Sequence, residues 1–211
     1  MNNLVLYNLR QFFVIKSMFV VSSISVIISF IAIGLAEFGP NSAEFVYIIT
    51  IIFPLIATNS FADQIIGDDY ESGNLDFQII AFEIYEVVIS KFLALFAFMV
   101  CVLFVSCVSS SIIFSLDVNE LLLVFLGSTP VAFSSSGAIL AFSAINVYFE
   151  KKAKLISSVI LSFIIPSIIM FGLFVNLKNW VYLIFALGIN LIIVPIFVYS
   201  SIFLIKDIYN N

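Results

Sequence analysis

The chain alternates between long apolar runs and short polar breaks along most of its 211 residues. A bilayer core about 30 Å thick is crossed by roughly 20 helical residues, and six of the apolar runs reach that length. They predict six transmembrane helices, near residues 17–36, 43–62, 87–114, 121–147, 155–175 and 181–204. The pattern therefore predicts an all-α polytopic membrane protein in which residues 1–211 form a single membrane domain.

Residues 1–16 precede the first apolar run and have a pattern of their own. Leu6, Leu9 and Phe13 share one face of a helix. Polar side chains occupy the other faces: Asn8, Arg10 and Gln11. We expect a short amphipathic helix along the membrane surface. The alternative is that these residues extend the first span.

The longest polar break runs from Asp63 to Glu86 and reads DQIIGDDYESGNLDFQIIAFEIYE. Seven of the thirteen carboxylates of the chain lie in it: Asp63, Asp68, Asp69, Glu71, Asp76, Glu83 and Glu86. Because charged side chains are costly in lipid, we expect a loop or short helix in water between the second and third spans. Gly67 and Gly73 allow tight backbone turns and are expected to bracket a loop.

Part of this break has helical periodicity. Asn74 is a candidate N-cap, and Asp76 would lie in the first turn, where the helix dipole favours a negative charge. Apolar residues then recur at i, i+4 and i+7 and predict one apolar helix face: Leu75, Ile79 and Phe82. Asp76 and Glu83 line another face. The segment 63–86 is thus expected to contain a short amphipathic helix, the alternative being a solvated loop.

Lysine and arginine set the expected orientation, because both are enriched on the cytoplasmic side of membrane proteins. With six spans and a cytoplasmic N-terminus, seven basic residues lie on the inner side: Arg10, Lys16, Lys91, Lys151, Lys152, Lys154 and Lys206. Only Lys178 would lie outside. We therefore expect both termini, the segment 63–86 and the tail 205–211 in the cytoplasm.

Composition supports a membrane protein and excludes several functions. Hydrophobic residues make up 63% of the chain, charged residues make up 10%, and the mean hydropathy is +1.25. No basic face for nucleic acid is present. The chain has no histidine, which removes the commonest general base, metal ligand and haem ligand. Cys101 and Cys107 fall on different faces of a helix, so we expect neither a disulfide nor a metal pair between them. Because no other catalytic constellation is visible, we expect no metal site, cofactor or catalytic residue.

The sequence also bears on how such a protein would be driven. No predicted span carries a clear charge at its centre, which argues against an ion-coupled transporter or a cation channel. No lysine follows Gly67 or Gly73 in the spacing of a phosphate-binding loop, so any ATP would be bound by a separate subunit. Prolines lie inside four spans and could kink them: Pro54, Pro130, Pro166 and Pro195.

The polar break contains the run Asp68-Asp69-Tyr70-Glu71-Ser72-Gly73-Asn74-Leu75-Asp76. It resembles the Asp-Asp-x-x-x-Gly-x-Leu-Glu/Asp signature of the haem exporter protein B (CcmB) family. Asp63 falls where that family tends to have Glu, and Lys91 where it has a lysine at the start of the third span. Two other runs are similar to its fourth and fifth spans: Leu126–Thr129 and Ile165–Gly172. The chain departs from the family at Phe77, at Lys151-Lys152-Ala153 and at Ser162.

The resemblance implies a non-catalytic permease subunit of a haem exporter complex for c-type cytochrome biogenesis. The implied partners are a cytoplasmic ATPase (CcmA-like), CcmC-like and CcmD-like membrane proteins and, indirectly, the haem chaperone CcmE. Because ATPase pairs are arranged with two-fold symmetry, we also expect a second copy of the chain or a related chain. The segment between the second and third spans would be the helix that couples to the ATPase, through Asp68, Asp69, Gly73, Leu75 and Asp76. The implied location is a bacterial inner membrane, with the mitochondrial inner membrane as the alternative.

Three other functions remain open at this point. The chain could be a general permease of the same broad class for a lipid, a drug or a polysaccharide. It could also be an assembly platform that transports nothing. A membrane enzyme is the most distant alternative, because the sequence shows no catalytic constellation.

Overall fold

Every element that the structure describes is a helix. The computed structural model describes residues 2–14, 62–114, 117–149 and 164–210. Within these ranges the helices, in chain order, are α1 (Asn2–Val14), α4 (Ala62–Glu71), α5 (Asn74–Ala81), α6 (Ile84–Phe114), α7 (Val118–Tyr148), α9 (Ile165–Leu177) and α10 (Trp180–Asn210). The predicted all-α class is therefore confirmed for the described part of the chain.

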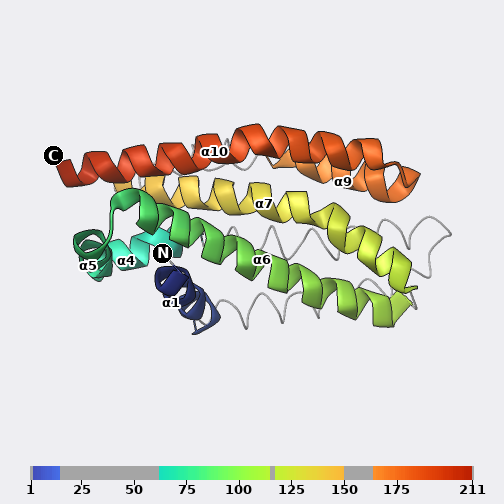
Figure 1. Ribbon diagram of the computed structural model, residues 1–211, viewed down its shortest axis with the longest axis horizontal. Helices are drawn as coiled ribbons and strands as arrows, with labels where there is room; N and C mark the ends of the chain where they lie inside the picture. The colour runs from blue at the N-terminus through green and yellow to red at the C-terminus, as the bar shows by residue number, and fades with distance from the viewer. Residues whose placement is uncertain (1, 15–61, 115–116, 150–163, 211) are drawn as a thin grey trace.

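Three long helices run side by side and give the molecule its length (Figure 1). α6, α7 and α10 contain 31 residues each, or about 46 Å at ~1.5 Å per residue. All three are long and apolar enough to cross a membrane. α9 is a shorter apolar helix that packs against α7 and α10. Several helices of this character indicate a membrane protein.

The six predicted spans are recovered in part. Three of them correspond to α6, α7 and α10: the spans near 87–114, 121–147 and 181–204. The span near 17–36 lies outside the described residues, as does all but the last residue of the span near 43–62. Of the span near 155–175, the structure describes α9, which begins at Ile165. The structure thus shows three helices of membrane-spanning length.

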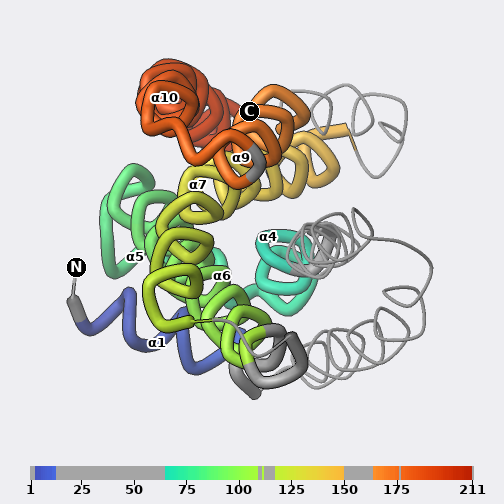
Figure 2. Tube along the Cα trace, turned by 90° about the vertical axis from the view of Figure 1, so that its right-hand side faces the viewer, coloured from blue at the N-terminus to red at the C-terminus, as the bar shows by residue number. Residues whose placement is uncertain are grey.

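α7 is the central helix of the bundle. It packs against α4, α6, α9 and α10, and the view along the bundle shows it between α10 and α6 (Figure 2). Small residues crowd its buried surface: Gly127, Ser128, Ala132, Ser134, Ser135, Ser136, Gly137, Ala138, Ala141, Ser143 and Ala144. Small side chains let helix backbones approach closely, which drives helix association where lipid is as apolar as the side chains.

Gly127 shows how close this approach is. A Cβ atom placed there would lie 2.6 Å from Cδ1 of Phe174 in α9. No side chain fits at position 127 unless the Phe174 ring moves, and that ring also packs on Trp180, with 5.3 Å between ring centroids. The absence of a side chain at Gly127 therefore brings α7 and α9 together.

α10 has two different sides. Large apolar side chains are exposed along its outer face: Ile184, Phe185, Leu187, Leu191, Ile192, Ile196, Tyr199 and Phe203. Its inner face carries the buried Asn190, whose Nδ2 donates to the Pro130 carbonyl oxygen of α7 at 2.7 Å. The Ser167 hydroxyl of α9 donates to Asn190 Oδ1 at 2.8 Å. This node joins three apolar helices through hydrogen bonds that have no competition from water.

The prolines have different positions in their helices. Pro130 lies within α7 and Pro195 within α10, and both helices continue through them. Pro166 lies in the first turn of α9, where a missing N–H removes no helical hydrogen bond. Pro166 thus lies at the start of the described helix α9, and the part of the predicted span 155–175 that precedes Ile164 lies outside the described residues. Pro54 lies outside the described residues.

α1 is a helix, as predicted, and one of its faces is buried against the bundle. Leu4, Asn8 and Phe12 are buried, whereas Leu6 is 58% exposed. α1 packs on α6, where Phe12 meets Phe98 with ring centroids 6.1 Å apart. α6 therefore covers the face that carries Leu4, Asn8 and Phe12, while Leu6 of the predicted apolar face stays exposed and Leu9 is half-buried. Figure 2 shows α1 running across the direction of the long helices.

Candidate functional site

The polar break between residues 63 and 86 folds as two short helices, α4 and α5, at one end of the bundle (Figure 1). The turn between them is closed by backbone hydrogen bonds from Ser72 N to Asp68 O and from Gly73 N to Tyr70 O. Gly73 has φ +73°, a left-handed conformation that favours glycine. Gly67, in contrast, lies inside α4, so the prediction that both glycines bracket a loop is wrong at Gly67.

Asn74 does not have the predicted capping role. Gly73 occupies the N-cap position of α5, and no side chain caps this helix. Asn74 is the first helical residue, and its Nδ2 donates instead to Oδ1 of Asp69 at 2.7 Å. The Asn74 side chain therefore donates to a buried carboxylate of the preceding helix and does not accept a backbone N–H at the start of α5.

α4 is fixed to the central helix. Ile65 and Ile66 are buried, and α4 packs along α7. The backbone N–H of Ile66 donates to the Ser143 hydroxyl of α7 at 2.9 Å. An apolar contact and a hydrogen bond thus attach the start of the polar break to the bundle.

A buried ion pair lies where α4, α5 and α6 meet. The Lys91 ammonium of α6 contacts Oδ2 of Asp69 in α4, and Lys91 is only 1% exposed. Lys91 Nζ also donates to the Ile65 carbonyl oxygen at 3.3 Å. Asp69 accepts from Asn74 Nδ2 and, at 3.3 Å, from Gln78 Nε2 of α5. We call these groups the ion-pair cluster: Ile65, Asp69, Asn74, Gln78 and Lys91.

The ion-pair cluster fixes the relative positions of three helices. Removing two charges from water costs several kcal/mol per ion, and an ion pair offsets this only if hydrogen bonds satisfy the remaining donors and acceptors. Asp69 and Lys91 both have such additional bonds. Because the cost of separating the charges is high, α4 and α5 are held on the first turns of α6 as one unit.

α1 contributes a second polar contact beside this cluster. Asn8 Nδ2 donates to the Ser90 hydroxyl at 2.9 Å, and Ser90 is the residue before Lys91. Ser90 Oγ in turn donates to the Val87 carbonyl oxygen at 2.7 Å. The Tyr7 hydroxyl also lies 3.5 Å from Asn74 Oδ1. The N-terminal helix is therefore attached to the same end of the bundle as the polar break.

The five predicted coupling residues lie in two different environments. Asp69 and Leu75 are buried, and their side chains contact the rest of the chain. Asp68 and Asp76 are exposed, and Gly73 lies in the turn. Asp76 also accepts a hydrogen bond from the Tyr209 hydroxyl near the end of α10. Of the predicted set, only Asp68, Gly73 and Asp76 face outward, and their contact with a partner stays a prediction.

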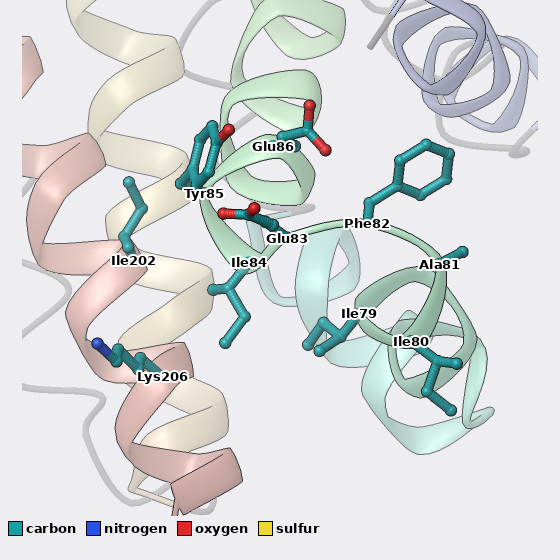
Figure 3. A pocket seen from close by; sticks show the side chains of 10 residues that line it. All are labelled: Ile79, Ile80, Ala81, Phe82, Glu83, Ile84, Tyr85, Glu86, Ile202 and Lys206. Atoms are coloured by element: carbon teal, nitrogen blue, oxygen red, sulfur yellow. The ribbon is translucent and has the colours of Figure 1, made fainter.

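Two outward-facing residues of α5 were missed by the sequence reasoning. Phe77 is 74% exposed and Ile80 is 82% exposed, and a spacing of three places them on one helix face. Figure 3 shows Ile80 on the side of α5 away from α10. The predicted apolar face of Leu75, Ile79 and Phe82 instead turns partly or wholly inward. Residues 75–82 contain more apolar side chains than one buried helix face can hold, and this excess could have indicated a second, exposed apolar face.

The described residues contain no cluster of three or more histidine, cysteine or acidic residues that could hold a metal ion. Cys101 and Cys107 are both free thiols, one exposed and one buried. The exposed side chains at this end of the bundle include carboxylates, Lys206 and large apolar residues.

Comparison with known proteins gives relatives but no family. The chain is 29% identical over 176 residues to an uncharacterized protein of Rickettsia prowazekii, covering 79% of this chain and 78% of that protein. It is 28% identical over 167 residues to an uncharacterized protein of Rickettsia conorii, with the same coverage of 79% and 78%. No family model matches the chain, and no solved structure matches it. The likeness to the haem exporter B family therefore rests on the residues quoted above.

Proposed function

We propose that this chain is the membrane subunit of an ATP-driven transport complex and that α5 receives the contact of a separate ATPase subunit. One observation carries the proposal: α5 presents Phe77 and Ile80 to the outside while its inner side is tied to α6 through the ion-pair cluster. A helix with an exposed contact face that is firmly attached to the bundle can transmit a movement of its partner to the spanning helices.

The charges beside these two residues favour a protein partner over the membrane surface. Asp76 precedes Phe77 in the sequence, and both residues are exposed. Cytoplasmic leaflets are negatively charged and repel carboxylates. A protein groove with an apolar floor and a basic rim would accept both features, and buried aromatic anchors of this kind dominate binding energies.

The helix contacts define how movement would pass into the spans. A force on α5 reaches α6 through Gln78, Asp69 and Lys91. It reaches α7 through α4, by way of the Ile66–Ser143 hydrogen bond. Packed rigid helices joined by hydrogen bonds and ion pairs carry such coupling between sites. Because ATPase subunits of this class act in two-fold pairs, we propose two copies of the chain in the complex.

The resemblance to the haem exporter B family supplies the substrate class of the proposal. The chain would serve c-type cytochrome biogenesis in a bacterial inner membrane, with a CcmA-like ATPase and CcmC-like and CcmD-like membrane proteins. ATP hydrolysis by the ATPase would release the haem-loaded CcmE chaperone. A permease for another substrate fits the same fold, because the contact face of α5 specifies a driving partner and not a cargo.

A deletion strain tests this proposal. Cells that lack the chain are expected to lose haem-stained c-type cytochromes, and expression of the chain is expected to restore them. A variant with both Phe77 and Ile80 changed to alanine should restore neither the cytochromes nor co-purification of the ATPase. Normal cytochromes in the deletion strain, together with co-purification of the ATPase and the chain from wild-type cells, would assign the complex to another substrate. A Phe77/Ile80 variant that restores the cytochromes and co-purifies the ATPase as well as the unaltered chain does would overturn the proposal.

A further inference from the structure

A groove lies between α10 and the segment that joins α5 to α6 (Figure 3). Its volume is about 670 Å³. One continuous stretch, Ile79–Glu86, forms one wall, and Ile202 and Lys206 of α10 form the other. None of these residues belongs to the ion-pair cluster, and only Ile80 belongs to the proposed partner contact.

The groove lies at the level where apolar helix gives way to polar residues. The apolar span of α6 begins at Ile84, and the apolar run of α10 ends at Lys206 and Asp207. Tyr85 lines the groove, and Tyr209 lies about one helical turn after Lys206 on α10. Tyrosine and charged residues at helix ends mark the boundary between the lipid chains and the headgroups. The groove therefore opens at the depth of phospholipid headgroups.

The lining combines both signs of charge with a long apolar surface. Glu83 and Lys206 are exposed, and Glu86 is half-buried. Among the described residues, no ion pair joins Lys206 to either glutamate within 4.0 Å. The opposite charges thus face one groove without neutralising each other, and Ile84 and Ile202 continue its wall toward the lipid chains.

We propose that this groove binds a zwitterionic phospholipid with a primary ammonium headgroup, such as phosphatidylethanolamine. The Lys206 ammonium would pair with the lipid phosphate, and Glu83 and Glu86 would accept hydrogen bonds from the lipid ammonium. A choline headgroup has no N–H to donate, and an anionic headgroup would be repelled by the two carboxylates. The acyl chains would lie along Ile84 and Ile202.

Lipid retention measured by native mass spectrometry tests the site. The full chain would be purified from vesicles of phosphatidylethanolamine, phosphatidylcholine and phosphatidylglycerol in equal amounts. We expect preferential retention of phosphatidylethanolamine, reduced about tenfold by Lys206→Met and by Glu83→Gln, since one lost charge-assisted contact is worth about a factor of ten. Both positions are exposed, so folding should be unaffected, as circular dichroism would verify.

The exposed pair Lys178 and Glu120, which lies 3.6 Å apart at the other end of the bundle, supplies the matched controls. Lys178→Met and Glu120→Gln should leave retention unchanged. Equal retention of the choline lipid, or a preference for phosphatidylglycerol, would overturn the proposal. So would variants that lower ATPase co-purification and leave lipid retention unchanged, because the groove would then belong to the partner contact.

Discussion

Lys91→Met is expected to cause the largest loss of stability of any single substitution considered. The change leaves the buried Asp69 carboxylate without its cation, although Asn74 and Gln78 still donate to it. Removing one partner of a buried pair costs about 3–5 kcal/mol, because the other charge stays buried and uncompensated. Denaturant unfolding of the chain in detergent micelles, followed by the fluorescence of its one tryptophan, would measure the loss.

Two comparisons make this result specific. Lys178→Met removes a lysine whose ion pair with Glu120 is exposed, and it should change stability by less than about 1 kcal/mol. The double variant Asp69→Leu/Lys91→Met removes both charges and should recover most of the stability lost by Lys91→Met. A Lys91→Met protein as stable as the Lys178→Met protein would contradict the ion-pair cluster.

Changing Phe77 and Ile80 together to alanine is expected to have the largest effect on partner binding. Both side chains are largely exposed, so folding does not depend on them. Central aromatic and aliphatic anchors cost about 2 kcal/mol or more each when truncated, so binding should fall by more than about a hundredfold. Co-purification with the ATPase subunit, quantified by titration, measures the loss.

The matched control for this prediction lies on the outer face of α10. Ile184 and Phe185 are the same residue types and are exposed to a similar degree, 67% and 60%. They lie at the other end of the bundle from α5 (Figure 1), so their change to alanine should leave ATPase binding unaltered. Equal losses from both double variants would indicate a general effect of exposed apolar residues and would refute the assigned face.

The elements that could be predicted from the sequence are those set by local pattern. The long apolar runs became α6, α7 and α10, and the acidic break became two short helices outside them. The helix in residues 1–16 was also predictable, because its periodicity is a property of the segment itself. Its buried face was not, since Asn8 is buried by its bond to Ser90, 82 residues away.

The ion-pair cluster could not be read from local pattern for the same reason. Lys91 reads as one of several basic residues near a membrane boundary, and Asp69 as one of seven carboxylates in a solvated segment. Only the packing of α4 and of α6 against α7 places the two side chains together. A lysine just inside an apolar run nevertheless indicates a buried ion pair, because a charge at that depth needs a partner of opposite sign.

The structure also separates two roles within the run that carries the family resemblance. Asp69 and Leu75 hold the segment in place, since both are buried. Asp68, Gly73 and Asp76 lie on the outside or in the turn, together with the neighbouring Phe77. Short signatures of this kind mix residues that build a helix pair with residues that face a partner. A sequence pattern alone assigns both groups to the same contact.

Photo-crosslinking from α5 in intact membranes shows directly whether an ATPase subunit binds this helix. A photoreactive phenylalanine analogue at position 77 replaces a side chain that is 74% exposed, and the same analogue at Phe185 serves as the control. An ATPase docked on α5 would give an adduct between position 77 and a soluble ATPase subunit, identified by mass spectrometry, and no such adduct from position 185. Adducts from position 77 with lipid alone, or with proteins that bind no nucleotide, would contradict this docking.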